Sequence, residues 1–116
     1  MAIERRHSGA RISRVVIHGD TVYLAGLVAL ESRGGSVKEQ TRAILHHIDR
    51  LLAEAGTDKT KLLTSTVWLA DIRDAEAMNE VWEEWLPEGC APARSTIEGK
   101  LTSPHYAVKI AATAAR

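Results

Sequence analysis

The chain has 116 residues, with 15 Lys and Arg against 15 Asp and Glu, so its formal net charge is zero. At 45% hydrophobic and 26% charged residues it has a globular composition, and its length fits one domain, residues 1–116, with a radius of roughly 13 Å. No apolar run approaches the roughly 20 residues that cross a bilayer, and no Lys/Arg cluster predicts general nucleic-acid binding. A polar N-terminus and a single cysteine, Cys90, predict a cytoplasmic protein with neither membrane nor nucleic-acid partners.

The first predicted elements form a hairpin. Residues Arg14–His18 and Thr21–Leu27 have the composition of two strands, and Gly19-Asp20 between them is typical of a tight turn.

A long helix is predicted from about Ser36 to Ala55. Its apolar residues recur at three- and four-residue steps and form one stripe. Ser36 and Glu39 have the spacing of a capping box, and Gly56 supplies the left-handed residue that ends a helix.

A third strand, Lys61–Leu69, and a second helix, from about Asp74 to Leu86, follow. Either Asp71 or Asp74 is the expected N-cap of that helix. Pro87 ends it, because a proline disfavours helical geometry at the residue before it.

The segments Arg94–Leu101 and His105–Thr113 are predicted to form a closing pair of strands joined through Thr102-Ser103-Pro104. The order of elements predicts an α+β fold with one sheet and two helices, both on the same face. The last strand places small, weakly polar residues such as Ala111 and Thr113 on its second side. Such a face suits contact between subunits better than contact with water, so we expect a homo-oligomer.

The sequence contains no spacing that predicts a metal site. His46 and His47 are adjacent on a helix and point about 100° apart, which is poor geometry for one metal ion. Cys90 lies in a loop with no neighbouring base that would activate it as a nucleophile. The chain has no GxSxG, P-loop or GxGxxG motif, which excludes the common hydrolase, NTPase and dinucleotide-binding classes.

The segment Pro92-Ala93-Arg94-Ser95-Thr96 offers a cradle for a small anion. Arg94 provides a rigid fork that matches a carboxylate, and Ser95 and Thr96 add hydroxyl and backbone donors. The alternative is that Arg94 is a solvated charge at the start of a strand. Asn79, at the edge of the second helix's apolar stripe, is either a buried amide that needs partners or a half-exposed one.

Motifs along almost the whole chain resemble, in order and spacing, those of the Rid family of reactive intermediate deaminases, the YjgF-type proteins. They are Gly19-Asp20-Thr21-Val22-Tyr23-Leu24-Ala25-Gly26, Glu39-Gln40-Thr41, Leu52-Ala53-Glu54-Ala55-Gly56, Trp68-Leu69-Ala70-Asp71, Met78-Asn79 and Pro92-Ala93-Arg94-Ser95-Thr96. The two tryptophans of the second helix and the ending Pro104-His105-Tyr106-Ala107-Val108-Lys109-Ile110 resemble the YoaB-like branch. The resemblance implies a chorismate-mutase-like fold, a single mixed sheet with two helices on one face. It also implies a homotrimer with ligand clefts between subunits.

The resemblance further implies an activity: hydrolysis of short-lived 2-imino or enamine acids to 2-keto acids and ammonia, without a metal or an organic cofactor. In that chemistry Arg94 binds the carboxylate of the small ligand. Ser95 and backbone groups near Thr96 help to hold the substrate and its water, which is mostly catalysis by positioning. The positions that match the rest of the family's cleft are Ile12, Ala25, Gly26 and Lys109.

Three of these positions depart from the family's pattern. Lys109 stands where the family has a catalytic glutamate, Ala25 replaces the serine before Gly26, and Ile12 takes the place of a cleft tyrosine. If Lys109 lies near Arg94, two cations face one small site. That arrangement favours a doubly anionic ligand, or a neutral lysine acting as a base or nucleophile.

Three functions remain open on sequence alone. The first is the deaminase, in which Arg94 binds the carboxylate while water activation is weakened or altered by Lys109. The second is a catalytically weak trimer that binds small carboxylates. The third, translation inhibition or RNA cleavage, is disfavoured by the zero net charge and the lack of a basic, aromatic surface.

Overall fold

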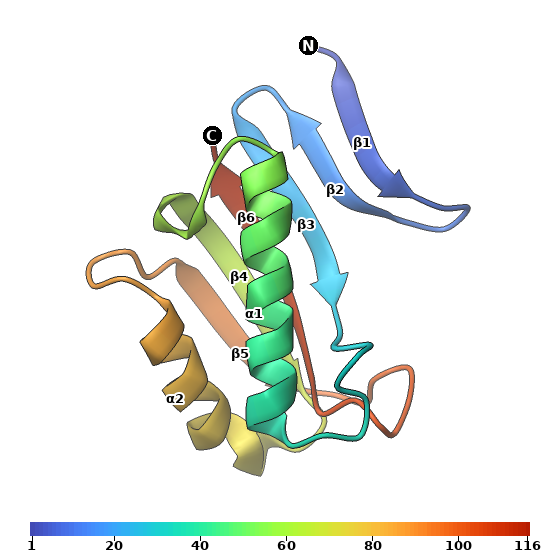
Figure 1. Cartoon of the computed structure of the whole chain (residues 1–116), viewed down its shortest axis with the longest axis vertical. Helices are drawn as coiled ribbons and strands as arrows, with labels where there is room; N and C mark the ends of the chain where they lie inside the picture. The colour runs from blue at the N-terminus through green and yellow to red at the C-terminus, as the bar shows by residue number, and fades with distance from the viewer.

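Six strands and two helices make up the computed structural model, which describes residues 1–116. The strands are β1 (Ile3–Ser8), β2 (Ser13–His18), β3 (Thr21–Leu27), β4 (Leu62–Leu69), β5 (Ala93–Glu98) and β6 (Val108–Ala115). The helices are α1 (Val37–Glu54) and α2 (Ala75–Trp85). Between them lie two single turns of 3-10 helix, η1 (Lys59–Lys61) before β4 and η2 (Ile72–Asp74) after it. The strands form one sheet in the order β1-β2-β3-β6-β4-β5, and both helices lie across the same side of it (Figure 1). The predicted single sheet with two helices on one face is confirmed.

Helix α1 follows from its local sequence. The Ser36 hydroxyl accepts a hydrogen bond from the Glu39 amide at 3.1 Å, as the capping pattern predicts. Gly56, just after the helix, has a φ of 82°, in the left-handed region that favours glycine. The helix buries its predicted apolar stripe together with Gln40, whose side chain is 1% exposed.

Helix α2 starts one residue later and ends one residue earlier than predicted. Of the two candidate N-caps, Asp71 is the one whose carboxylate accepts a backbone hydrogen bond, from Arg73, and it caps the turn η2 rather than α2 itself. Asp74 precedes α2 and makes no side-chain cap. Leu86 is extended, as expected of a residue before a proline.

The predicted pairing of the last two strands is wrong. β6 lies between β3 and β4 and is antiparallel to both, whereas β5 runs parallel to β4 at the edge of the sheet. The crossover through α2 brings the chain back to the same end of β4, which is the geometry that a parallel neighbour requires. β5 ends at Glu98 instead of Leu101, and β6 begins at Val108 instead of His105.

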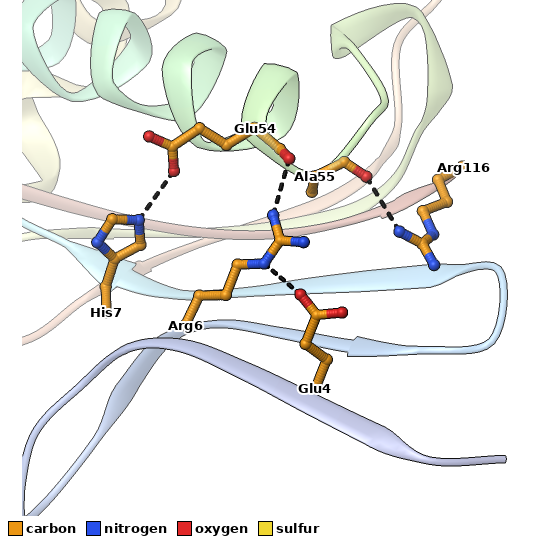
Figure 2. Close-up of polar contacts among 6 residues, drawn as sticks. All are labelled: Glu4, Arg6, His7, Glu54, Ala55 and Arg116. Atoms are coloured by element: carbon orange, nitrogen blue, oxygen red, sulfur yellow. Dashed lines mark hydrogen bonds and ion pairs between the residues drawn. The ribbon is translucent and has the colours of Figure 1, made fainter.

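The first strand, β1, was not predicted, because its sequence Ile-Glu-Arg-Arg-His-Ser has no apolar alternation. It pairs only with β2, and polar side chains connect it to the end of α1 (Figure 2). Arg6 Nη1 donates to the Glu54 carbonyl at 2.8 Å, and His7 Nε2 lies 2.8 Å from the Glu54 carboxylate. Arg6 also bonds to the Glu4 carboxylate. These contacts hold the outer strand against the helix.

The sheet has one buried face and one open face. Alternate residues of β6 confirm the predicted division: Val108 and Ile110 are fully buried under the helices, while Ala111 and Thr113 face the other way and are half-buried. One core of 22 buried residues fills the space between the sheet and the helices. The radius of gyration is 13.8 Å, and neither helix is long and apolar enough to cross a membrane.

Candidate functional site

Arg94 lies near the start of the edge strand β5, with its side chain on the helix side of the sheet. Its Nη2 donates to Asn79 Oδ1 at 2.7 Å, and the guanidinium carbon lies 5.0 Å from the centre of the Trp82 ring. Nη1 lies 3.9 Å from the Met78 sulfur. All three partners come from helix α2, so the helix orients the guanidinium. The amide of Asn79 is therefore half-buried and partnered.

The Arg94 guanidinium forms no ion pair within the chain. Burial lowers its pKa, and the charge of Glu83 opposes this effect. An arginine remains charged in proteins, so this half-buried group is a cation held by a neutral amide and an aromatic ring. An incoming carboxylate would find several N–H donors free.

Arg94 opens into a cavity of about 430 Å³ at the end of α2, here called the arginine cavity. Its lining residues come from α2 and from the loop that leads into β5: Asn79, Trp82, Glu83, Leu86, Pro87, Glu88, Gly89, Ala91, Pro92 and Arg94. The loop and the helix thus enclose the guanidinium on two sides and leave space for a small molecule beside it.

The two residues after Arg94 point in different directions. Strand alternation places Thr96, which is half-buried, on the same side of β5 as Arg94. Ser95 is exposed and lies on the open face of the sheet. The expected cradle of Arg94 with both hydroxyls is therefore wrong for a single chain, because successive side chains leave a strand on opposite sides.

Lys109 lies on the open face, away from Arg94. It pairs in register with Trp68 of β4, and its Nζ lies 5.1 Å from the centre of the Trp68 ring. It lines a second cavity of about 290 Å³, here called the lysine cavity, which is formed by Gly26, Val28, Trp68, Lys100, Leu101, Thr102 and Lys109. Within one chain the two cations do not face one site, so the condition that Lys109 lies near Arg94 is not met in a single chain.

The other predicted site residues gather around Gly26. Gly26 lines the lysine cavity, and Ile12 lines an adjoining cavity of about 140 Å³ that also includes Gly26. A Cβ at position 26 would overlap the Cε atom of Lys109, so any other residue there would require the lysine side chain to shift. Ala25 is half-buried in the irregular part of β3, between the register positions Leu24 and Leu27.

Most of the residues that line these cavities, Trp82 and Lys100 among them, were not predicted as site residues. Trp82 is both a buried core residue and a contact of Arg94, and its position three residues after Asn79 places both on one face of α2. Lys100 lies in the loop after β5, where no periodic pattern indicates which way a side chain points.

The chain is similar to known proteins over almost its whole length. Residues 3–116 match the family model described as Endoribonuclease L-PSP. The chain is 40% identical to the RutC family protein YoaB of Escherichia coli K12 over 115 residues, which is 99% of each protein. A crystal structure of an uncharacterized protein from Pseudomonas aeruginosa has a TM-score of 0.95 and 39% identity over 99% of both chains. A member of the YjgF protein family from Neisseria meningitidis has a TM-score of 0.95 and 35% identity, covering 100% of this chain and 96% of the other.

These likenesses agree with the order of the sequence motifs and with the mixed six-stranded sheet carrying two helices. The chain belongs to the Endoribonuclease L-PSP family, the YjgF/Rid proteins, with relatives of the YoaB type.

Proposed function

We propose that this protein is a deaminase that hydrolyses 2-imino or enamine acids to 2-keto acids and ammonia, with Arg94 binding the substrate carboxylate. The observation that carries this proposal is the half-buried Arg94 guanidinium, oriented by Asn79 and Trp82, without an acidic partner, at the wall of a cavity. Such a group binds a carboxylate by two parallel hydrogen bonds and thereby fixes the orientation of the whole substrate.

The proposed active form is a homotrimer with clefts between subunits. Two observations support an assembly. The open face presents small and weakly polar residues at the centre of the sheet, such as Ala111 and Thr113. The matched family positions also divide between two places in one chain, Arg94 on the helix side and Lys109 with Gly26 on the open face. A neighbouring copy would bring the second group of residues to the first.

The chemistry needs one water molecule and no change of oxidation state. The water oxygen adds to the imine carbon, the electron pair of the C=N bond moves to nitrogen, and a proton passes from the water to that nitrogen. The carbinolamine then transfers its hydroxyl proton to nitrogen as the C–N bond breaks, which releases ammonia and leaves the 2-keto acid. In this proposal Arg94 holds the carboxylate, and backbone groups near Thr96 position the water.

Lys109 of a neighbouring copy would stand near the reacting carbon. A protonated lysine donates hydrogen bonds and accepts none, whereas a carboxylate accepts a proton from water. We therefore expect Lys109 to activate water less well than a glutamate at the same position. The same feature favours the second candidate function, a catalytically weak trimer that binds small carboxylates.

The test couples an amino-acid dehydratase to the protein and follows the release of 2-keto acid. The variants are Lys109→Glu, Arg94→Ala and Arg94→Lys, and Arg73→Ala serves as a control because Arg73 is an exposed arginine on η2, paired with Asp71. We expect Arg94→Ala to abolish the acceleration of 2-keto-acid release and Arg94→Lys to lose most of it. Lys109→Glu should release 2-keto acid faster than the wild type. Wild-type turnover equal to that of Lys109→Glu contradicts the assigned role of Lys109. Binding of 2-keto acids without any acceleration supports the second candidate.

A further inference from the structure

Two lysines line the lysine cavity, and no acidic residue does. Lys100 enters from the loop after β5 and Lys109 from β6, and neither forms an ion pair with any carboxylate of the chain. In the whole chain, 15 lysines and arginines are balanced by 15 aspartates and glutamates. This cavity is therefore a local concentration of positive charge on a protein whose net charge is zero.

The Lys109 side chain is held in place by its neighbours. It passes over Gly26, where any Cβ would overlap it, and its ammonium lies over the Trp68 ring. The indole attracts the cation without neutralising it. Val28 and Leu101 provide apolar wall, and Thr102 adds a hydroxyl. Both lysines line the same cavity of about 290 Å³, which has room for an anionic group of a few atoms.

We propose that the lysine cavity binds a carboxylate, and that the preferred ligands are 2-imino and 2-keto acids that carry a second carboxylate. This proposal rests on the proposed function for two points, the placing of the first carboxylate on Arg94 and the assembly that brings the lysine cavity of a neighbouring copy to it. In the assembled protein, Arg94 of one copy would bind the carboxylate next to the reacting carbon. Lys109 of the neighbouring copy, near the reacting carbon, and Lys100 beyond it would both bind the second carboxylate, which in a five-carbon acid lies only three bonds from that carbon.

Two ligands of equal chain length test the binding. 2-Oxoglutarate carries two carboxylates and 2-oxopentanoate carries one, and neither needs to react. We expect calorimetric titration of the wild type to show 2-oxoglutarate bound at least about tenfold more tightly, since a hydrogen bond to a charged group is among the stronger polar contacts. Lys100→Gln and Lys109→Gln should each reduce that preference, and the double variant should abolish it. Lys61→Gln, a change at an exposed lysine on η1, is the matched control.

Equal affinities of the wild type for the two ligands, no binding of either, or a preference that survives in the double variant would overturn the proposal. Turnover separates it from the proposed function. The imines of the same two acids, generated from the amino acids by an oxidase, are hydrolysed in parallel assays. If the binding preference holds and neither imine is hydrolysed faster than in buffer, the deaminase proposal fails and the lysine cavity stands. If both imines are hydrolysed without any preference, the lysine cavity fails and the deaminase stands.

Lys109→Glu should have opposite effects on the two substrates, improving turnover of the monocarboxylic imine and weakening the use of the dicarboxylic one. A general loss of positive charge would not improve either. With the monocarboxylic imine, this variant should turn over faster than the wild type, because the new carboxylate accepts a proton from water. With the dicarboxylic imine, its KM should rise, because the carboxylate repels the far end of the substrate. A KM that stays unchanged for the dicarboxylic imine contradicts the proposal.

Discussion

Arg94 and Lys109 belong to strands that both pair with β4, yet their side chains leave the sheet on opposite faces. Arg94 is in register with the buried Ser65, and Lys109 with Trp68 on the open face. The separation follows because Ser65 and Trp68 are three positions apart on β4, and side chains an odd number of positions apart on a strand leave it on opposite faces. One chain therefore cannot direct both cations at one small ligand.

This separation predicts complementation between defective chains. Arg94→Ala chains lack the first carboxylate site, and chains with both Lys100→Gln and Lys109→Gln lack the second. Each variant alone should bind 2-oxoglutarate weakly. If the two variants are mixed in equal amounts and assemble into the proposed trimer, about one quarter of the proposed clefts should combine both intact halves. The stoichiometry of tight binding in a calorimetric titration measures this fraction, and a mixture with no tight sites would contradict the intersubunit cleft.

Asn79 is predicted to position Arg94. Asn79→Ala removes the 2.7 Å hydrogen bond, and a bond to a charged group contributes about 1.5–3 kcal/mol. We expect the affinity for 2-keto acids to fall about tenfold, and the unfolding temperature to fall by several degrees. Asn79→Asp is the informative partner, because its carboxylate would pair with the guanidinium and compete with the ligand. It should weaken binding more than alanine does while leaving the fold at least as stable, and tighter binding by this variant would exclude the positioning role.

Gln40 is predicted to be the most sensitive polar residue of the fold. Its buried amide donates to the carbonyls of Gly35 and His105, at 2.9 and 3.0 Å, and accepts from the Ala107 amide at 2.8 Å. Gln40→Leu should lower the free energy of unfolding by roughly 3 kcal/mol, because it removes three hydrogen bonds and leaves the Gly35 carbonyl and the Ala107 amide without this partner. Gln40→Glu, of nearly the same shape, should also destabilise, since a carboxylate cannot donate to two carbonyls. Urea denaturation measures both, with the exposed Arg42→Ala as control.

The contact between His7 and Glu54 predicts a pH dependence at the outer strand. The hydrogen bond from His7 holds the pKa of the Glu54 carboxyl below its ordinary value of 4.5. A carboxyl whose pKa is lowered by folding stabilises the fold above its ordinary pKa, and the stabilisation is lost as the pH falls through the lowered value. Glu54→Gln should therefore reduce stability at pH 7 and match the wild type in strong acid. Urea midpoints across the acid range test this, with Glu76→Gln as control, and a gap between Glu54→Gln and wild type that persists in strong acid would contradict the assignment.

Local signals in the sequence were enough to predict the helices. The Ser36 cap, the apolar stripe of α1 and the Gly56 stop all act within a few residues of one another. The polar strand β1 has no such signal, since it is held by β2 and by contacts to Glu54 that lie 47 and 48 residues away in the chain. Sequence periodicity does not carry information about partners at that separation.

The site was predictable as a set of residues but not as an arrangement. The type of side chain suggested a carboxylate at Arg94, and the family pattern selected Gly26 and Lys109. Which face each residue occupies depends on the strand order, and the placement of β6 between β3 and β4 was not predicted. Lys100 could not be assigned to the site from the sequence, because no pattern indicates that the loop after β5 reaches the lysine cavity.

The placement of β6 also bears on how the molecule is made. It is the last of the six strands to be synthesised, yet it supplies the only ladder between the β1-β2-β3 part and the β4-β5 part of the sheet. The two parts cannot join until residues 108–115 are available, so the gap between β3 and β4 stays unfilled in any shorter nascent chain. During that interval the edges of β3 and β4 are open to strands of other nascent chains, and holding them apart is a task suited to a chaperone.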